Sequence, residues 1–310
     1  MVVKCTNEQQ RQQYFAACPS VSALNERHDA LMQTLIADTL TQLGQAPCRF
    51  TVFITGSGGR KEQGFWSDQD HGLIYTNEAY TDYFMAFGQA LSHRLAAAGY
   101  AYCDGGIMTS NPQWNGSVDM WQRQLNQWLQ AAAWSEIRYT QIFYDARSLF
   151  GDDLLLLELK RQIDGYISQY PQLLKRFSTN IMHFKRALGP FGQLLPERYG
   201  EYQRKLDLKY SAFLPYINCV RLLALEHHVH ATSTQERIAI LAPQQRILLE
   251  DVGYYFEALL SLRFRYQQPK KYQDTYYISL NELSTADRRL LKKILQRAKQ
   301  LHEAVMARYT

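Results

Sequence analysis

Residues 55–70 read TGSGGRKEQGFWSDQD and determine how the first half of the chain is interpreted. Before them, residues 49–55 (RFTVFIT) are β-branched and aromatic, which predicts a buried strand. After them, residues 71–76 (HGLIYT) predict a second strand. The quoted stretch therefore connects two predicted strands, with glycines near its start and two aspartates at its end.

The glycine-rich end of this stretch has the composition of a phosphate-binding turn. Gly56, Gly58 and Gly59 allow backbone conformations barred to other residues and leave room for a ligand at main-chain N–H groups. Ser57 adds a hydroxyl donor in the same turn. A short helix beginning at residues 59–63 would add the positive potential of its N-terminal dipole.

The other end of the stretch, Asp68-Gln69-Asp70, resembles a metal site. In an extended strand alternate residues share a face, so both carboxylates can point into one site while Gln69 points away. Two such carboxylates need a cation, and hard oxygen ligands suit Mg²⁺ or Mn²⁺. Two aspartates at a strand end are more often structural. The ordered set of strand, Gly-Ser, spacer, Asp-x-Asp and strand nevertheless favours nucleotidyl transfer with release of pyrophosphate.

Hydrophobic periodicity predicts the remaining elements. In the first half these are helices over residues 21–46, 80–98 and 118–134 and strands over residues 100–108 and 138–146. Their order indicates a mixed α/β domain that ends near Gly151. From Leu154 onward the period is helical, and Ser233 and Ser284 begin capping patterns that predict two helix starts. The basic residues that follow Ser284 are interpreted first as a solvated helix face.

Composition restricts the class of protein. The chain has 310 residues, of which 46% are hydrophobic and 20% charged, and its net charge is +5. Its basic residues are dispersed, so a nucleic-acid partner is not expected. The five cysteines are odd in number and lack CxxC spacing, which argues against a disulfide framework or a zinc site. Without an apolar stretch of about 20 residues, we expect a cytoplasmic protein with no membrane partner.

Several residues of the opening stretch carry a family resemblance. Gly56-Ser57, Gly59-Arg60, Glu62, Ser67-Asp68 and Asp70 resemble the GS…GR.E…SD.D signature of polymerase-β-like nucleotidyltransferases. More narrowly, the chain is similar to bacterial nucleotidyltransferases related to the PII-protein uridylyltransferase, which often follow CBS and cyclic-nucleotide-binding modules. The resemblance continues over residues 103–112, 142–151, 205–225, 231–241 and 280–291.

The resemblance implies an α+β fold class and an activity. The expected parts are an N-terminal extension (1–19), a nucleotidyltransferase domain with a small mixed sheet flanked by helices (20–155), and an all-α helical-bundle domain (156–310). The implied enzyme, of the EC 2.7.7 type, uses Mg²⁺ or Mn²⁺ to transfer a nucleoside monophosphate from an NTP to a hydroxyl acceptor. By analogy the acceptor is a regulatory protein, which suggests a role in signal transduction.

The resemblance also assigns roles to residues. It makes Asp68 and Asp70 catalytic metal ligands and assigns nucleotide or phosphate binding to Gly56, Ser57, Gly59, Arg60 and Ser67. The third carboxylate of related enzymes falls near Gly106, where Asp104 is the favoured substitute and Asp145 the other candidate. If neither reaches the metal, the alternative is a catalytically weak nucleotide-sensing or protein-interaction module.

Three further sets of residues have two interpretations. Arg60 and Glu62 could contact phosphate and metal, or they could pair and brace the turn. Lys205 and Lys209, predicted four residues apart on a helix, could reach the triphosphate or lie in solvent. A tryptophan series is interpreted first as packing and second as a surface for a nucleotide base. It comprises Trp114, Trp121, Trp128 and Trp134.

Overall fold

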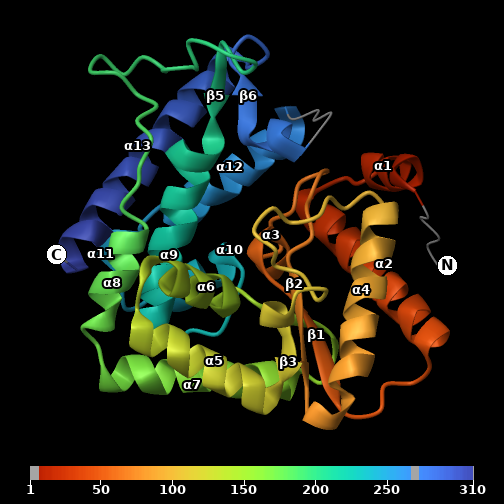
Figure 1. Ribbon diagram of the computed structural model, residues 1–310. Helices are drawn as coiled ribbons and strands as arrows, with labels where there is room; N and C mark the ends of the chain where they lie inside the picture. The colour runs from red at the N-terminus through yellow and green to blue at the C-terminus, as the bar shows by residue number, and fades with distance from the viewer. Residues whose placement is uncertain (1–6, 267–271, 310) are drawn as a thin grey trace. The chain divides into compact units, whose positions relative to one another are not determined.

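The computed structural model describes residues 7–266 and 272–309 (Figure 1). The chain divides into two compact units, Met1–Tyr166 and Ile167–Thr310. The sequence predicted a boundary between residues 155 and 156, which lies inside helix α7 (Asp153–Gln169). That helix runs through the division at residue 166 without a break, so no loop marks the boundary.

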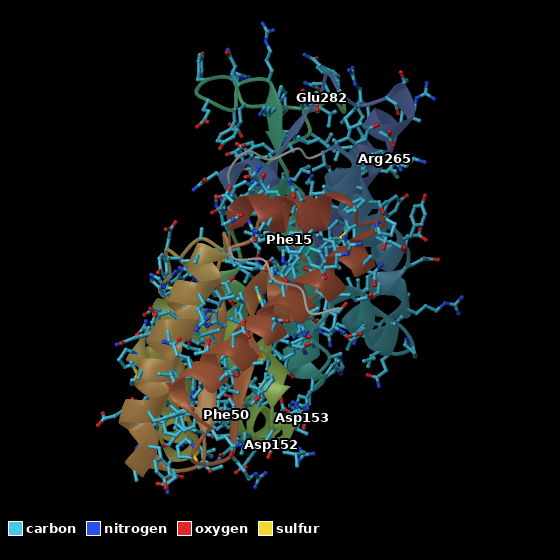
Figure 2. All side chains as sticks on the ribbon, turned by 90° about the vertical axis from the view of Figure 1, so that its right-hand side faces the viewer. Phe15, Phe50, Asp152, Asp153, Arg265 and Glu282 are labelled. Carbon is cyan, nitrogen blue, oxygen red and sulfur yellow. The ribbon has the colours of Figure 1, made fainter. Side chains whose placement is uncertain are left out.

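The first unit is built on a four-stranded sheet in the order β3-β2-β1-β4. Its central strand β1 (Phe50–Ile54) pairs antiparallel with β2 (His71–Tyr75), which confirms both strands predicted around the opening stretch. Strand β4 (Arg147–Gly151) pairs antiparallel with the other edge of β1, and β3 (Asn115–Ser117) runs parallel to β2. Beyond β4, the Asp152 N–H donates to the Phe50 carbonyl (2.9 Å), and the two residues lie close together in Figure 2.

Helices cover both faces of this sheet (Figure 1). Side chains alternate along β1 and therefore identify the helices that cover each face of the sheet. On one face, Phe50 packs against Phe84 with ring centroids 5.7 Å apart. Phe53 points the other way and contacts Trp121 and Phe143, at 5.7 and 5.6 Å. The helices are α2 (Val21–Leu43) and α4 (Thr81–Ala97) on the first side and α5 (Val118–Ala131) and α6 (Trp134–Tyr144) on the second.

Two strand predictions in this unit were wrong. Residues 138–146 belong mostly to helix α6, whose buried Ile137, Thr140, Gln141 and Tyr144 recur at helical spacing. Their β-branched and aromatic composition favoured a strand, but the period of burial is that of a helix. Residues 100–108 contain only an isolated bridge between Ala101 and Asp68, because the segment turns at Asp104-Gly105.

The N-terminal helix α1 (Glu8–Ala16) belongs to the first unit and packs on it. Arg11 is fully buried, and its guanidinium lies 4.8 Å from the ring centroid of Tyr100 and 5.4 Å from that of Trp66. The segment expected to be an extension therefore covers part of the domain.

The tryptophan series is mainly core. Trp114, Trp121 and Trp128 are buried and pack on one another, whereas Trp134 is 62% exposed. The packing interpretation is confirmed for the three buried rings.

The second unit is mainly helical, as predicted, with one addition. Strands β5 (Lys205–Asp207) and β6 (Tyr277–Ser279) form an antiparallel pair that the sequence analysis missed. Ser233 and Ser284 accept hydrogen bonds from the backbone N–H groups of Glu236 and Asp287, which confirms both predicted helix starts. The helices are α8 (Leu173–Asn180), α9 (Leu214–Glu226), α10 (Thr234–Leu241), α11 (Arg246–Leu249), α12 (Val252–Tyr266) and α13 (Thr285–Tyr309), with a π-helix over Lys209–Phe213.

Short 3-10 turns complete the described elements. They are Glu78–Tyr80, Pro112–Trp114 and Tyr272–Tyr276. No helix within residues 7–266 and 272–309 is both long and apolar enough to cross a membrane.

Candidate metal and nucleotide site

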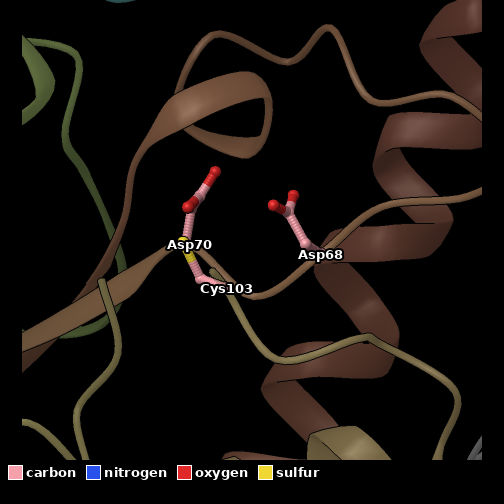
Figure 3. Close-up of side chains that lie close together, drawn as sticks. All are labelled: Asp68, Asp70 and Cys103. Carbon is pink, nitrogen blue, oxygen red and sulfur yellow. The ribbon is translucent and has the colours of Figure 1, made fainter. Parts of the chain in front are cut away.

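Asp68, Asp70 and Cys103 form a cluster of three possible metal ligands, here called the Asp-Asp-Cys cluster. One ligand atom from each residue lies within 4.8 Å of the others. Figure 3 shows the two carboxylates pointing to the same side of the chain, with the sulfur of Cys103 close to Asp70. The structure therefore brings together the two predicted aspartates and adds a thiol that the sequence analysis did not predict.

Gly56 makes room for one of these carboxylates. A Cβ atom at this position would lie 2.2 Å from Asp70 Oδ2, far inside van der Waals contact. Gly56 also has φ of +56°, a left-handed conformation that costs glycine little. The Thr55 N–H donates to the Asp70 carbonyl (2.8 Å), so the start of the glycine turn and the end of the Asp-x-Asp motif are adjacent.

The glycine turn is the one-turn helix α3 (Gly56–Gly59), which begins three residues earlier than predicted. Arg147 supports its end: its guanidinium Nε and Nη2 atoms donate to the Gly58 carbonyl at 3.1 and 2.9 Å. Arg147 Nη2 also lies 2.6 Å from Asp29 Oδ1 of helix α2. Ser57 is partly exposed within this turn, where a ligand could reach it.

The residue between the two aspartates is anchored in the core. Gln69 is fully buried, and its Nε2 donates to the carbonyls of Ser92 (3.0 Å) and Tyr100 (3.1 Å). His71 Nδ1 accepts from the Thr109 N–H, so His71 Nε2 carries the proton and donates to Gln69 Oε1 (3.0 Å). Burial lowers the pKa of His71 to about 3, which keeps the imidazole neutral in this network.

The loop before Asp68 is held by helix α2. Asn25 Oδ1 accepts from the Gln63 N–H (2.9 Å). His28 Nε2 donates to the Gly64 carbonyl (3.0 Å), and its Nδ1 accepts from the Tyr100 hydroxyl (2.8 Å). Burial lowers the pKa of His28 to about 3. A helix preceding the site in sequence thus fixes the path of the chain into the Asp-x-Asp motif.

Arg60 is committed to a buried ion network. Its guanidinium lies 2.8 Å from Glu62 Oε2 and 2.7 Å from Asp145 Oδ2, and its side chain is only 11% exposed. Burial lowers the pKa of Arg60, but the two carboxylates outweigh burial and raise it above its ordinary value. This placement favours bracing of the turn over the predicted contacts of Arg60 with phosphate and of Glu62 with metal.

The two candidates for a third carboxylate lie elsewhere. Asp145 is fully buried at the end of α6, not on a strand as expected, and its carboxylate pairs with Arg60. Asp104 is exposed in a turn, and the Asp-Asp-Cys cluster contains its neighbour Cys103 instead. The strand geometry that placed Asp104 on the catalytic face is absent from residues 102–106.

The remaining predicted residues are placed as follows. Ser67 is buried and its Oγ accepts from Gln63 Nε2 (2.9 Å). Gly59 packs so closely on Asp145 that a Cβ would lie 2.2 Å from its carbonyl oxygen. Lys205 is on strand β5 and Lys209 on the π-helix, so the predicted shared helix was wrong, and Lys209 Nζ lies 4.1 Å from the Tyr276 ring centroid.

Electrostatics keep the Cys103 sulfur protonated in the absence of a cation. Burial, followed by the charge of Asp70, raises the pKa of Cys103 to about 12, and its thiol hydrogen-bonds to the Asp70 carboxylate. Two carboxylates beside this thiol form a strongly negative cluster, which a bound cation would neutralise.

Comparison with known protein families agrees with this geometry. A family model described as "Putative nucleotidyltransferase DUF294" matches residues 6–134, and one described as "Putative nucleotidyltransferase substrate binding domain" matches residues 171–309. No curated protein matches the chain. The fold is that of a nucleotidyltransferase domain of the polymerase-β-like type followed by a helical domain. Together the two matches span most of the chain, which belongs to the family described as "Putative nucleotidyltransferase DUF294".

Proposed function

We propose that this protein is a metal-dependent nucleotidyltransferase that moves a nucleoside monophosphate from an NTP to a hydroxyl group, with a regulatory protein as acceptor. The observation that carries the proposal is the convergence of Asp68 and Asp70 beside the Gly56-Ser57 turn, in a chain of a nucleotidyltransferase family. The protein acceptor rests on the resemblance to the PII-protein uridylyltransferase group alone.

The residues present fit a divalent cation. Asp68 and Asp70 supply carboxylate oxygens from one short segment, and the missing Cβ of Gly56 leaves the space that Asp70 Oδ2 occupies. The two carboxylates would hold the ion. When bound, it would supply charge neutralisation at the reacting phosphate and lower the pKa of the attacking hydroxyl.

The chain's own residues would orient the nucleotide. The turn at Gly56 and Ser57 offers a hydroxyl and main-chain N–H groups to the phosphates beyond the reacting one. The acceptor oxygen forms a bond to the α-phosphorus, and the bond from that phosphorus to the β-phosphate oxygen breaks, so pyrophosphate leaves with the electron pair. The hydroxyl proton passes to solvent or to a carboxylate of the cluster.

The test is pyrophosphate release with each labelled NTP and a divalent cation, with the purified chain alone and with cell lysate as a source of acceptor. We expect activity with at least one NTP. Asp68→Asn and Asp70→Asn should each reduce it by at least about 100-fold, the scale of losing a main electrostatic contribution to catalysis.

Asp38→Asn is the matched control, because Asp38 is exposed on helix α2 away from the cluster in sequence and should leave turnover unchanged. Full turnover in both site variants would contradict the proposal.

A second function is favoured by one observation. Asp145 pairs with Arg60, and Asp104 lies outside the ligand cluster, so within the described chain neither predicted carboxylate joins Asp68 and Asp70. A nucleotide-sensing or protein-interaction module with weak transfer fits that arrangement. Divalent-dependent nucleotide binding without pyrophosphate release, alone and with lysate, would favour this function.

A further inference from the structure

We infer that Cys103 is the third protein ligand of the metal site and that it gives the site a preference for a thiophilic divalent cation, Zn²⁺, over Mg²⁺. The inference rests on the proposed function in that Asp68 and Asp70 are taken as metal ligands. It goes further by assigning a ligand and a class of ion that the Asp-x-Asp motif alone does not specify.

The first argument is geometric. The sulfur of Cys103 and one oxygen each from Asp68 and Asp70 lie within 4.8 Å of one another. In a tetrahedral zinc site the Zn–S distance is about 2.3 Å and the Zn–O distance about 2.0–2.2 Å, so bound ligand atoms are roughly 3.5 Å apart. The three groups therefore need to approach one another by no more than about 1.3 Å to bind one ion.

The second argument is that the backbone fixes this juxtaposition. The Gln69 N–H donates to the Ala101 carbonyl (2.9 Å), and the His71 N–H donates to the Ile107 carbonyl (3.1 Å). These bonds hold the segment that carries Cys103 beside the segment that carries both aspartates. The position of the thiol is thus determined by hydrogen bonds on both sides of it.

The third argument is chemical. A site with three carboxylates presents only hard oxygen ligands, which suit Mg²⁺. Replacement of one oxygen by a thiolate sulfur shifts the preference toward Zn²⁺ and similar ions, since soft ligands bind softer cations more strongly. Metal binding favours the thiolate form of a cysteine ligand. Two carboxylates and one thiolate carry the same formal charge as three carboxylates.

The test uses the purified full chain loaded with Co²⁺ as a spectroscopic substitute for Zn²⁺. We expect thiolate-to-cobalt charge-transfer absorption in the wild type, its loss in Cys103→Ser, and its retention in Cys48→Ser, a partly exposed cysteine that serves as the matched control. Zn²⁺ affinity should fall by at least about tenfold in Cys103→Ser, since even outer partners of metal ligands contribute that much. Cys103→Asp should bind Mg²⁺ more tightly than the wild type does.

The outcomes separate this inference from the proposed function. The assignment of Cys103 would be overturned if the wild type shows no thiolate absorption. It would also be overturned if the absorption persists in both Asp68→Asn and Asp70→Asn. Either conclusion would hold even if pyrophosphate release is normal. Thiolate absorption that needs all three residues would support the assignment even if no NTP is turned over. The aspartate variants keep the test decisive if Cys103→Ser fails to fold.

Discussion

Arg60 Nη1 lies 2.7 Å from Asp145 Oδ2 inside the first unit, and both side chains are almost completely buried. Asp145→Asn removes one of the two carboxylates that pair with this guanidinium, while Glu62 remains 2.8 Å away. We therefore expect Asp145→Asn to lower the free energy of unfolding by about 1.5–3 kcal/mol, the scale of a hydrogen bond to a charged group, measured by urea denaturation. The control is Asp152→Asn: its partner Arg49 is 64% exposed, and a change below about 1 kcal/mol is expected. A stable Asp145→Asn protein that has lost turnover would instead identify Asp145 as a catalytic base.

Gly56→Ala should disable the cluster. The added Cβ would lie 2.2 Å from Asp70 Oδ2 and force that carboxylate to move. We expect weaker binding of divalent cations, by at least about tenfold, measured by equilibrium dialysis. Gly192→Ala is the matched control, because Gly192 has φ of +69° and nothing lies within 4 Å of its Cβ position. Equal metal affinity in both variants would argue against contact between Gly56 and the site.

His28 makes stability depend on pH. Its pKa is lowered from 6.5 to about 3 in the folded protein, first of all by burial. Below pH 6.5 the unfolded chain therefore binds a proton that the folded protein does not, and stability falls as the pH falls toward 3. We expect His28→Gln to reduce this slope by about 1.4 kcal/mol per pH unit, as measured by urea unfolding from pH 7 to 4. The same substitution at exposed His93 is the control.

The buried tryptophans should act through packing. Trp121 Nε1 donates to the Leu73 carbonyl (2.9 Å), and its ring lies 4.9 Å from that of Phe143. Trp121→Ala should cost about 3–5 kcal/mol of unfolding free energy, whereas exposed Trp134→Ala should change it by less than about 0.5 kcal/mol. A Trp134→Ala variant with unchanged stability and weakened nucleotide binding would assign that ring to base stacking.

The sequence was sufficient to predict the strands around the opening stretch and the convergence of the two aspartates. The strands follow from local composition, since their β-branched and aromatic residues form continuously buried runs within residues 50–54 and 71–75. The convergence of the aspartates follows from alternation across Gln69. Local composition was misleading at residues 138–146, where the buried Thr140, Phe143 and Tyr144 belong to a helix.

Cys103 could not have been identified from local sequence. It lies more than thirty residues from Asp70, and the family resemblance, which includes residues 103–112, gave Cys103 no role. Its proximity depends on hydrogen bonds from Gln69 and His71 to residues 101 and 107, which are tertiary contacts. The commitment of Asp145 to Arg60 is likewise visible only when α6 and α3 are packed together. The third ligand was therefore the least predictable part of the site.

The anchoring of Gln69 limits how this segment can change in length. Because side chains alternate across it, one inserted or deleted residue between Asp68 and His71 would exchange the two faces and put an aspartate where Gln69 meets the carbonyls of Ser92 and Tyr100. The preceding loop is anchored in a different way, by hydrogen bonds of Gln63 and Gly64 with side chains of helix α2. In related chains, the three positions from Asp68 to Asp70 are therefore expected to evolve by substitution alone.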